Sequence, residues 1–252
     1  MTNRWSWLAL GAGAYIAFTL AALPAGAVLR WWAPPGVGFQ GVEGTVWSGG
    51  AASVATDGFS LQNLRWRVRP WSLFLGRVAA NVEASIPDGF VSTDVVLTPS
   101  RVRLTGLRGG TSVPSLVGVL PVRGVRGQAS VAFDSLELED GWPSSAVGEL
   151  KLVGLETTPL IPNGTSQLLA LGDYTVTFVP AEERKLEARF VDNGGPLEVM
   201  GTLALDAERA YTLDALIKAR AGADQALVQG LEIMTADPDT EGRRRLTLTG
   251  SL

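Results

Sequence analysis

Apolar residues fill the N-terminal segment of the chain before any alternating pattern begins. From Trp5 to Leu29 there is no charged residue. A helix rises about 1.5 Å per residue, so a segment of this length can cross a hydrocarbon core of about 30 Å with some tilt. The pattern predicts one N-terminal transmembrane helix within an anchor formed by residues 1–32.

Tryptophans flank this segment at both ends: Trp5 and Trp7 at the start, Trp31 and Trp32 at the finish. Indole rings settle at the membrane–water interface, which predicts a membrane-interface role for all four residues. A cleavable signal peptide is the alternative, because ALPAGA at 22–27 resembles a small-residue cleavage site. The apolar stretch is longer than a typical signal core, which favours a retained anchor.

Small residues recur every four positions in the same segment, at Ala9, Gly13, Ala17 and Ala21. This spacing lets a second helix approach closely in lipid, and it predicts a helix-packing face. Chance is the alternative, since the segment is rich in alanine and glycine. The tail before the segment is short, so we expect the bulk of the chain to lie outside the cytoplasm.

After residue 33 the apolar period changes to that of a strand. Leu64, Trp66 and Val68 alternate with arginines, and a period of two recurs around residues 136, 150, 188, 203 and 246. A period of two with one apolar face is typical of half-buried antiparallel strands. Turn sequences such as PDG at 87–89 and DNGG at 192–195 separate them. The pattern predicts a mainly β chain whose residues 33–252 form an antiparallel, curved or sandwich-like β domain.

One or two short helices are expected among the strands. Ser112–Leu120 is one, with a proline early enough to be tolerated, and Ala223–Thr235 is the other. The second places four apolar side chains on one face, namely Leu227, Val228, Leu231 and Met234.

Glycines and tryptophans are concentrated in the first part of this β region. Glycine in a strand usually marks a bulge, a bend or a close backbone approach, and each buried indole removes a large apolar area from water. We predict that Trp47, Trp66 and Trp71 pack together beneath the first strands and that Pro70 ends the second strand. The alternative places an indole at a docking surface for a membrane partner. The structural motif comprises Gly41, Gly44, Trp47, Gly49, Trp66, Pro70, Trp71, Gly76, Trp142 and Pro143.

A Gly-Val-x-Gly start occurs twice, at Gly41 and at Gly124. It suggests that the β domain consists of two similar consecutive sheet segments, at about 33–121 and 122–252.

The amino-acid composition of the chain limits the kinds of catalytic and metal site that it can form. The chain has neither cysteine nor histidine, and only 18% of its residues are charged. The missing cysteines exclude disulfides and thiolate sites, and the missing histidines remove the commonest general base and metal ligand. We therefore predict that the chain is not an enzyme and has no catalytic, cofactor-binding or metal site.

Charge is divided unevenly along the chain. Residues 1–132 hold 11 basic and 5 acidic residues, whereas residues 133–252 hold 10 basic and 20 acidic ones. A basic half could lie near anionic lipid headgroups. We favour cross-strand pairing of the two halves, with the arginines at 65, 67 and 69 as an exposed row that meets acids on neighbouring strands. The acidic total gives no support to nucleic-acid binding.

Two further motifs are weak. DPDTEG at 237–242 resembles the start of a calcium loop, but Leu248 stands where the closing carboxylate belongs, so a polar loop is the better interpretation. NGT at 163–165 matches a glycosylation sequon that is too short to be informative.

Four segments in order carry a resemblance to a known family: GVEGTVWSGGA, LRWRVRPWSLFLGRV, DGWPSSAVGEL and NGGPLEVMGTLAL. The chain resembles the type II secretion system protein N (general secretion pathway protein N) family. The resemblance implies a single-pass Gram-negative inner-membrane protein with a periplasmic β-rich domain. It would be a non-catalytic scaffold or assembly factor for protein export across the outer membrane, with other secretion-system inner-membrane proteins as partners. A more distant likeness to AsmA-type proteins implies the alternative, a lipid-binding or lipid-guiding module.

Overall fold

A computed structural model of the chain describes residues 3–32, 36–56, 59–86, 88–116, 124–158, 168–180, 186–206, 208–235 and 237–251. In these ranges the helical elements are α1 (Asn3–Ala21), α2 (Ala25–Trp32), η1 (Pro70–Leu75), η2 (Val113–Leu116) and α3 (Gln225–Met234). The strands are β1 (Gly38–Gly44), β2 (Ser48–Thr56), β3 (Phe59–Arg69), β4 (Val78–Ile86), β5 (Gly89–Leu97), β6 (Arg101–Ser112), β7 (Val125–Glu139), β8 (Trp142–Thr157), β9 (Leu169–Pro180), β10 (Leu186–Asp192), β11 (Leu197–Leu205), β12 (Ala210–Ala219) and β13 (Arg244–Ser251).

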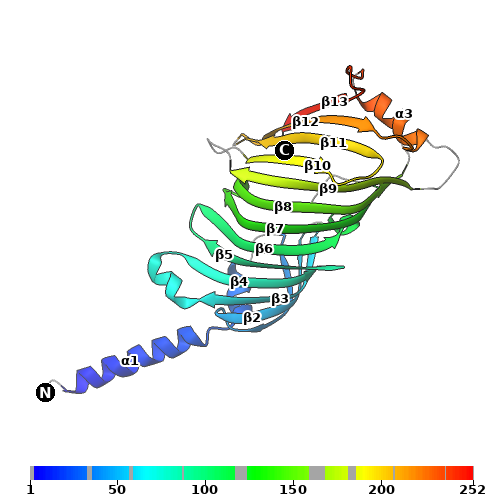
Figure 1. Ribbon diagram of the computed structural model, residues 1–252. Helices are drawn as coiled ribbons and strands as arrows, with labels where there is room; N and C mark the ends of the chain where they lie inside the picture. Colours follow the sequence, from blue (N-terminus) through cyan, green and yellow to red (C-terminus); the bar gives the residue numbers. More distant parts are fainter. Residues whose placement is uncertain are drawn as a thin grey trace.

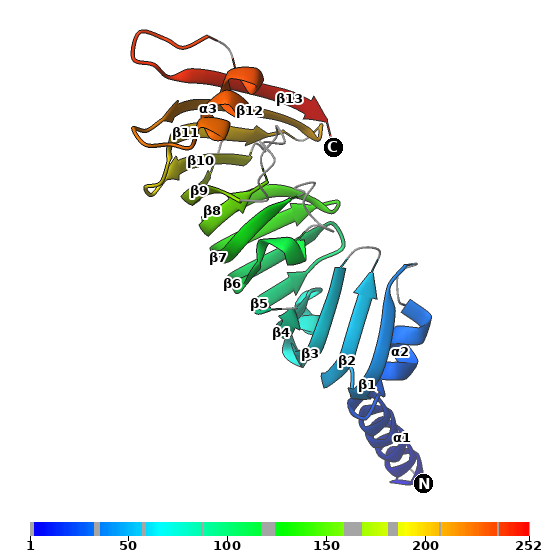
Figure 2. The ribbon, with the colours of Figure 1, turned by 90° about the vertical axis from the view of Figure 1, so that its right-hand side faces the viewer.

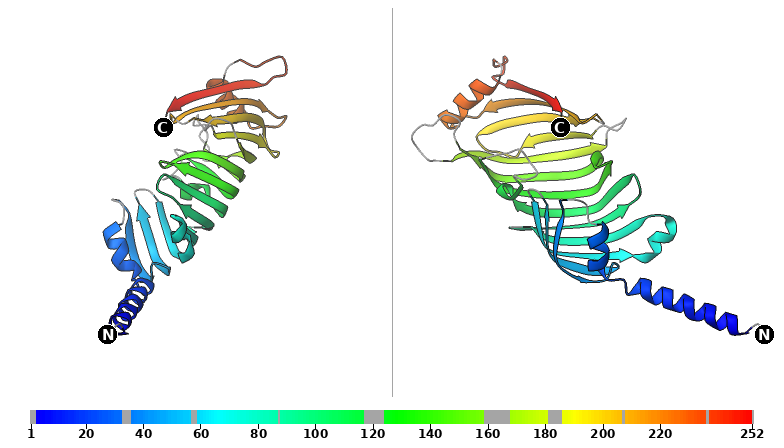
Figure 3. Two further views of the ribbon diagram at one scale, coloured as in Figure 1. Left: turned by 90° about the vertical axis from the view of Figure 1, so that its left-hand side faces the viewer. Right: turned by 180° about the vertical axis from the view of Figure 1, so that it is seen from behind.

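All of these strands belong to one antiparallel sheet in which each strand pairs with the next in sequence, from β1 to β13 (Figure 1). The sheet curves and twists along its length without closing on itself (Figures 1 and 3). The mainly β, antiparallel prediction is confirmed, in its curved-sheet form. Pairing continues without interruption from β6 to β7, which flank residues 121–122. The division into two similar segments stays a prediction.

The strand register gives the sheet one apolar and one polar face, since directly paired residues point to the same side. One apolar row crosses six strands through Val68, Ala80, Val95, Leu104, Leu136 and Ala146. A second row continues through Val131, Leu150, Val176, Phe190, Gly201, Ala215 and Leu246. A polar row lies on the other face, through Arg67, Asn81, Asp94, Thr105 and Ser135.

The predicted N-terminal transmembrane helix is not confirmed, because α1 ends at Ala21 and the separate helix α2 begins at Ala25. Pro24 forms an isolated bridge with Thr45, and the carbonyl of Leu23 accepts a hydrogen bond from Val46 N at 3.0 Å. These contacts turn the chain onto the sheet, where α2 packs beside β1 and buries Ala25 to 1% exposure. Within the described part of the chain, no helix combines the length and the apolar character that crossing a membrane requires.

The two short helices are found in different degrees. Of the first, Ser112 is the last residue of β6, Val113–Leu116 form the 3-10 turn η2, and residues 117–120 lie outside the described ranges. The second is confirmed as α3, whose N-terminus is capped by the Asp224 carboxylate accepting from Ala226 N at 2.8 Å. Leu227 and Leu231 pack on the sheet as expected, but Met234 is 56% exposed because it lies in the final turn.

Candidate interaction surfaces

The apolar face is concave over the central strands. Phe133 of β7, Ala146 of β8 and Leu186 of β10 form one buried cluster, and the ring of Phe133 lies 5.1 Å from that of Phe178. The indole N–H of Trp142, at the start of β8, donates to the carbonyl of Asp206, which follows β11, at 2.8 Å. Curvature therefore lets side chains of non-adjacent strands shield one another without a second sheet.

Short helical elements cover this face near its two ends (Figure 2). At the N-terminal end, a cavity of 260 Å³ lies between α2 and β3–β5, lined by Ala25, Val28, Leu29, Phe39, Val46, Leu64, Trp66, Val68, Val78, Ala80, Val82 and Leu97. At the C-terminal end, Leu227 of α3 packs with Leu169, Leu197 and Val199. Between these ends, η2 adds Val113 over Ala129 and Leu155. Among the described residues, these are the elements that pack on the apolar face, and much of its centre stays half-exposed.

Tryptophan hydrogen bonds join the N-terminal helix to the β1–β2 turn and this turn to β3. Trp47 donates its indole N–H to the carbonyl of Leu20 at 2.7 Å, and Trp66 donates to the carbonyls of Thr45 and Val46 at 3.3 and 3.2 Å. Both indoles are half-buried. Gly49 permits the close approach, because a Cβ at this position would lie 2.6 Å from the Trp66 ring.

Trp71 does not join this group: it is 80% exposed and stacks on Phe74 at 5.9 Å between ring centroids. The predicted packing of Trp71 with Trp47 and Trp66 is therefore wrong. Pro70 ends a strand as expected, although this strand is the third, β3, and not the second. It starts η1, in which Ser72 takes the inward position because its hydroxyl bonds two backbone groups. The sequence contained a signal for the exposed apolar side chains of η1, since WSLFL at 71–75 is an apolar run without strand alternation.

The remaining motif residues lie within strands or at the ends of elements. Gly44 (φ +82°) ends β1, Gly41 (φ +61°) lies within it, and Gly76 (φ +67°) caps η1. Pro143 pairs with Leu138 beside an irregularity in the β7–β8 ladder, and Arg209 lies 5.7 Å above the Trp142 ring. Each of these placements is structural.

The residues predicted for the membrane lie on α1 and α2. Trp7 is 68% exposed and Trp31 is 89% exposed, and Gly13 and Ala21 are exposed as well. The side chains of Trp5, Trp32, Ala9 and Ala17 lie outside the described residues, as does the sequon at Asn163. Their predicted roles in the membrane interface and in helix packing stay predictions.

The polar face carries ion pairs that join the basic and acidic halves of the chain. Arg101, Arg103 and Arg108 of β6 pair with Glu139, Glu137 and Asp134 of β7 at 3.4, 2.7 and 3.3 Å. From the exposed arginine row, Arg69 pairs with Asp94 of β5 at 2.9 Å. Cross-strand pairing thus accounts for the charge asymmetry at β6 and β7, where the basic and acidic halves of the chain meet.

A depression interrupts the polar face over β10–β12. Val191, Met200 and Leu216 occupy one cross-strand row there, and Val191 and Met200 are 47% and 40% exposed. Arg189, Asp214 and Arg245 surround this row in an open hollow of 510 Å³. An apolar centre with a charged rim is the composition of a protein-contact patch.

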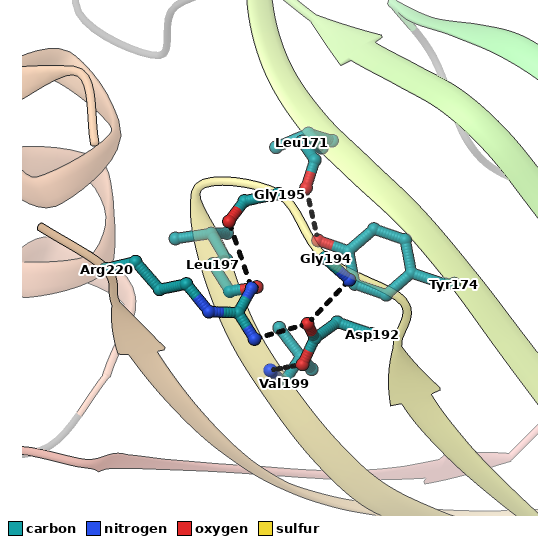
Figure 4. A network of polar contacts seen from close by, with 8 residues as sticks. All are labelled: Leu171, Tyr174, Asp192, Gly194, Gly195, Leu197, Val199 and Arg220. Carbon is teal, nitrogen blue, oxygen red and sulfur yellow. Dashed lines mark hydrogen bonds and ion pairs between the residues drawn. The ribbon is translucent and has the colours of Figure 1, made fainter. Parts of the chain in front are cut away.

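A polar network fixes the C-terminal end of the sheet (Figure 4). Arg220, after β12, donates to the Asp192 carboxylate at 2.6 Å and to the carbonyls of Gly195 and Leu197 at 3.0 and 2.9 Å. Asp192 also accepts from Val199 N and Gly194 N at 2.8 and 3.1 Å. No sequence pattern links Asp192 to Arg220, which is 28 positions away.

Titration in this network follows from the contacts. Burial disfavours the charged form of Asp192, but the Val199 N–H and the Arg220 guanidinium outweigh it and hold the pKa of Asp192 below its usual value. Burial, reinforced by the nearby Asp192 carboxylate, raises the pKa of Tyr174 to about 12. The Tyr174 hydroxyl donates to the carbonyl of Leu171 at 2.8 Å. The network is held together by charge and satisfied hydrogen bonds, and this is a structural role.

The described residues do not contain a group of three or more acidic side chains that could hold a metal ion. In the segment 237–242, Asp239 accepts from the backbone N–H groups of Glu241 and Arg243, both at 2.8 Å, and so closes a polar turn. The polar-loop interpretation is confirmed.

Sequence comparisons agree with this picture. The profile of the family described as "Type II secretion system (T2SS), protein N" matches residues 35–247. A protein named type II secretion system protein N from Aeromonas hydrophila is 29% identical over 248 residues, which cover 95% of each chain. A protein of the same name from Vibrio cholerae serotype O1 is 41% identical over 49 residues, 19% of each chain. No solved structure matches.

Proposed function

Because this chain belongs to the type II secretion system protein N family, we propose that it acts as a non-catalytic scaffold or assembly factor in the inner membrane, for protein export across the outer membrane. The family match from residue 35 to 247 is the observation that carries this proposal, since it includes almost the whole sheet. Membership makes the chain a component of the secretion machinery. Its location, its partners and its mode of action are the proposal.

The N-terminal residues support attachment to the membrane, with the sheet on the periplasmic side. The large apolar side chains described in α1 are 53–73% exposed and are distributed around the helix, at Trp7, Leu8, Leu10, Tyr15, Ile16, Phe18 and Leu20. A helix that is apolar on all sides needs an apolar environment. Residues 22–24 and the Trp47 hydrogen bond then connect this helix directly to the sheet.

The sheet supports a role in binding other secretion-system inner-membrane proteins. Its polar face carries the depression around Val191 and Met200, and the Arg245–Asp214 ion pair joins β12 and β13 beside it. Exposed apolar side chains on a rigid sheet can bury a partner side chain without refolding.

Photo-crosslinking in native membranes tests the scaffold proposal. A photoreactive amino acid at Met200 should capture another inner-membrane component of the machine, whereas the same group at Thr177, on the same face in β9, should capture less. Equal capture at both positions, or capture of no secretion component at any surface position, would contradict the proposed role.

A second candidate function rests on the concave apolar face. Its centre is half-exposed in the described structure, and the cavity beneath α2 is lined by apolar side chains alone. Such a surface could hold an acyl chain, which makes lipid binding the alternative. Native mass spectrometry of gently purified chain should then detect phospholipid, and Leu104→Glu at the centre of the face should remove it. A lipid-free chain would eliminate this candidate.

A further inference from the structure

The turn η1 has its polar residue inside and its apolar residues outside. Ser72 is 8% exposed, whereas Trp71, Phe74, Leu75 and Leu73 are 80%, 81%, 69% and 43% exposed. Folding alone favours the opposite arrangement, since burying a large apolar side chain stabilises a protein by about 1.5–3 kcal/mol. Four exposed apolar side chains within six residues mark a contact surface.

The backbone of η1 holds this arrangement in place. The Ser72 hydroxyl donates to the carbonyl of Arg69 at 2.7 Å and accepts from Ala79 N at 3.0 Å. Gly76, in the left-handed region, donates its N–H to the carbonyl of Leu73 at 3.0 Å, and Arg77 N donates to that of Ser72 at 3.3 Å. The exposed rings are therefore presented by a fixed turn.

The turn η1 and the end of α1 lie at the same end of the first three strands. The carbonyls of Leu20, in the last turn of α1, and of Leu23, just after it, accept hydrogen bonds from Trp47 and Val46 in the β1–β2 turn. The carbonyl of Trp47 accepts from Val68 N at 2.7 Å, and Val68 is two residues before η1. Figures 1 and 3 show α1 and η1 projecting on the same side of the molecule.

Charge around η1 suits an anionic lipid surface. From residue 65 to residue 82 the sequence holds four arginines and no acidic residue. Two of them, Arg69 and Arg77, flank the turn and are exposed, and Arg69 also pairs with Asp94 of β5. Arginines near a membrane surface are attracted to anionic headgroups, and indole rings prefer the headgroup layer.

We propose that η1 is a second membrane-contact site, in which Trp71, Phe74 and Leu75 enter the headgroup region of an anionic bilayer beside α1. The proposal rests on the membrane attachment of α1 in the proposed function. Two contacts on one edge fix the tilt of the sheet against the membrane, which a single helix leaves free.

Spin labelling of the full-length chain tests the site, because the chain has no native cysteine. A nitroxide is attached to Leu75→Cys in vesicles of phosphatidylethanolamine and phosphatidylglycerol. Its collision rates are measured with oxygen, which concentrates in lipid, and with a neutral nickel chelate, which stays in water. Relative to detergent solution, we expect a several-fold loss of nickel collisions and a gain in oxygen collisions. In phosphatidylcholine vesicles the loss should be smaller.

Three further variants separate the outcomes. A label at Ser60→Cys, exposed at the opposite end of β3, should remain accessible to nickel. The double substitution W71S/F74S should restore nickel access at position 75, and both side chains are exposed, so the fold should persist. A label at Ala14→Cys in α1 reports the attachment itself.

A label at 75 that nickel reaches, with the label at 14 protected, overturns the η1 site and leaves the anchor standing. Nickel access at both positions overturns the anchor as well. Protection at 75 without a gain in oxygen collisions means that protein covers the turn, and this also overturns the proposal.

Discussion

Replacing Asp192 by asparagine tests whether charge holds the C-terminal end of the sheet. The Asp192 side chain is 8% exposed and accepts from Val199 N, Gly194 N and the Arg220 guanidinium. An amide can keep one of these donors but turns an N–H toward another. A hydrogen bond to a charged group contributes about 1.5–3 kcal/mol. Arg220 is 38% exposed and solvent weakens its share, so we expect a loss of about 2 kcal/mol.

Urea unfolding at neutral pH, followed by circular dichroism, measures this loss. With a slope of about 3 kcal/mol per molar urea, the midpoint of Asp192→Asn should fall by about 0.7 M. The matched control is Asp214→Asn, which breaks the pair with Arg245 on the solvent-exposed face and should change the midpoint far less. An equal fall in both variants would show that burial of the carboxylate does not matter.

Urea unfolding at acidic pH is the sharper test, because the pKa of Asp192 in the folded protein is below its ordinary value of 3.8. For a lowered carboxyl pKa, the stabilisation is complete above the unfolded pKa and is lost as the pH falls through the folded pKa. The difference in unfolding free energy between wild type and Asp192→Asn should therefore be constant above pH about 5 and should shrink in stronger acid. A gap that persists unchanged after the wild-type carboxylate is protonated would refute the electrostatic explanation.

Three further substitutions, one of them with a matched control, probe packing, and each is measured by urea unfolding. Gly201→Ala should cost about 3 kcal/mol, since the new Cβ would meet the Phe190 ring at 2.3 Å and a backbone carbonyl at 2.4 Å; Gly110→Ala, whose nearest contact is 3.6 Å, should be tolerated. Trp142→Phe should cost about 1 kcal/mol by losing the bond to the Asp206 carbonyl, and an unchanged midpoint would contradict the bridging role. Leu227→Ala should cost about 3 kcal/mol; a loss below about 1 kcal/mol would mean that α3 does not seal its end of the sheet.

The β architecture could be predicted because its causes are local. Alternation around Leu64, Trp66 and Val68 specifies a one-sided strand, and turn sequences such as DNGG separate strands in order. Consecutive antiparallel pairing then needs no long-range information. The capped helix at 225–234 was equally readable, because Asp224 and the spacing of Leu227 and Leu231 are local signals.

The departures from prediction have long-range causes. The N-terminal helix ends at Ala21 because Leu23 and Pro24 pair with the β1–β2 turn, which is more than twenty residues away. Trp71 points outward because a serine hydroxyl, and not an indole, satisfies the backbone at the end of β3. Neither the open curvature of the sheet nor the Asp192–Arg220 pair has a local signature.

Sequential strand pairing has a consequence for how the molecule withstands damage and change. Every ladder joins immediate neighbours along the chain, so the free energy is close to a sum of hairpin increments, as in repeat proteins. Weakening the pairing of two strands in the middle should allow the strands on one side to unfold while those on the other side stay folded. Relatives could gain or lose a hairpin at a turn and simply become longer or shorter. By gaining or losing hairpins, a sheet of this kind can span a longer or shorter distance between two attachment points without needing a new hydrophobic core.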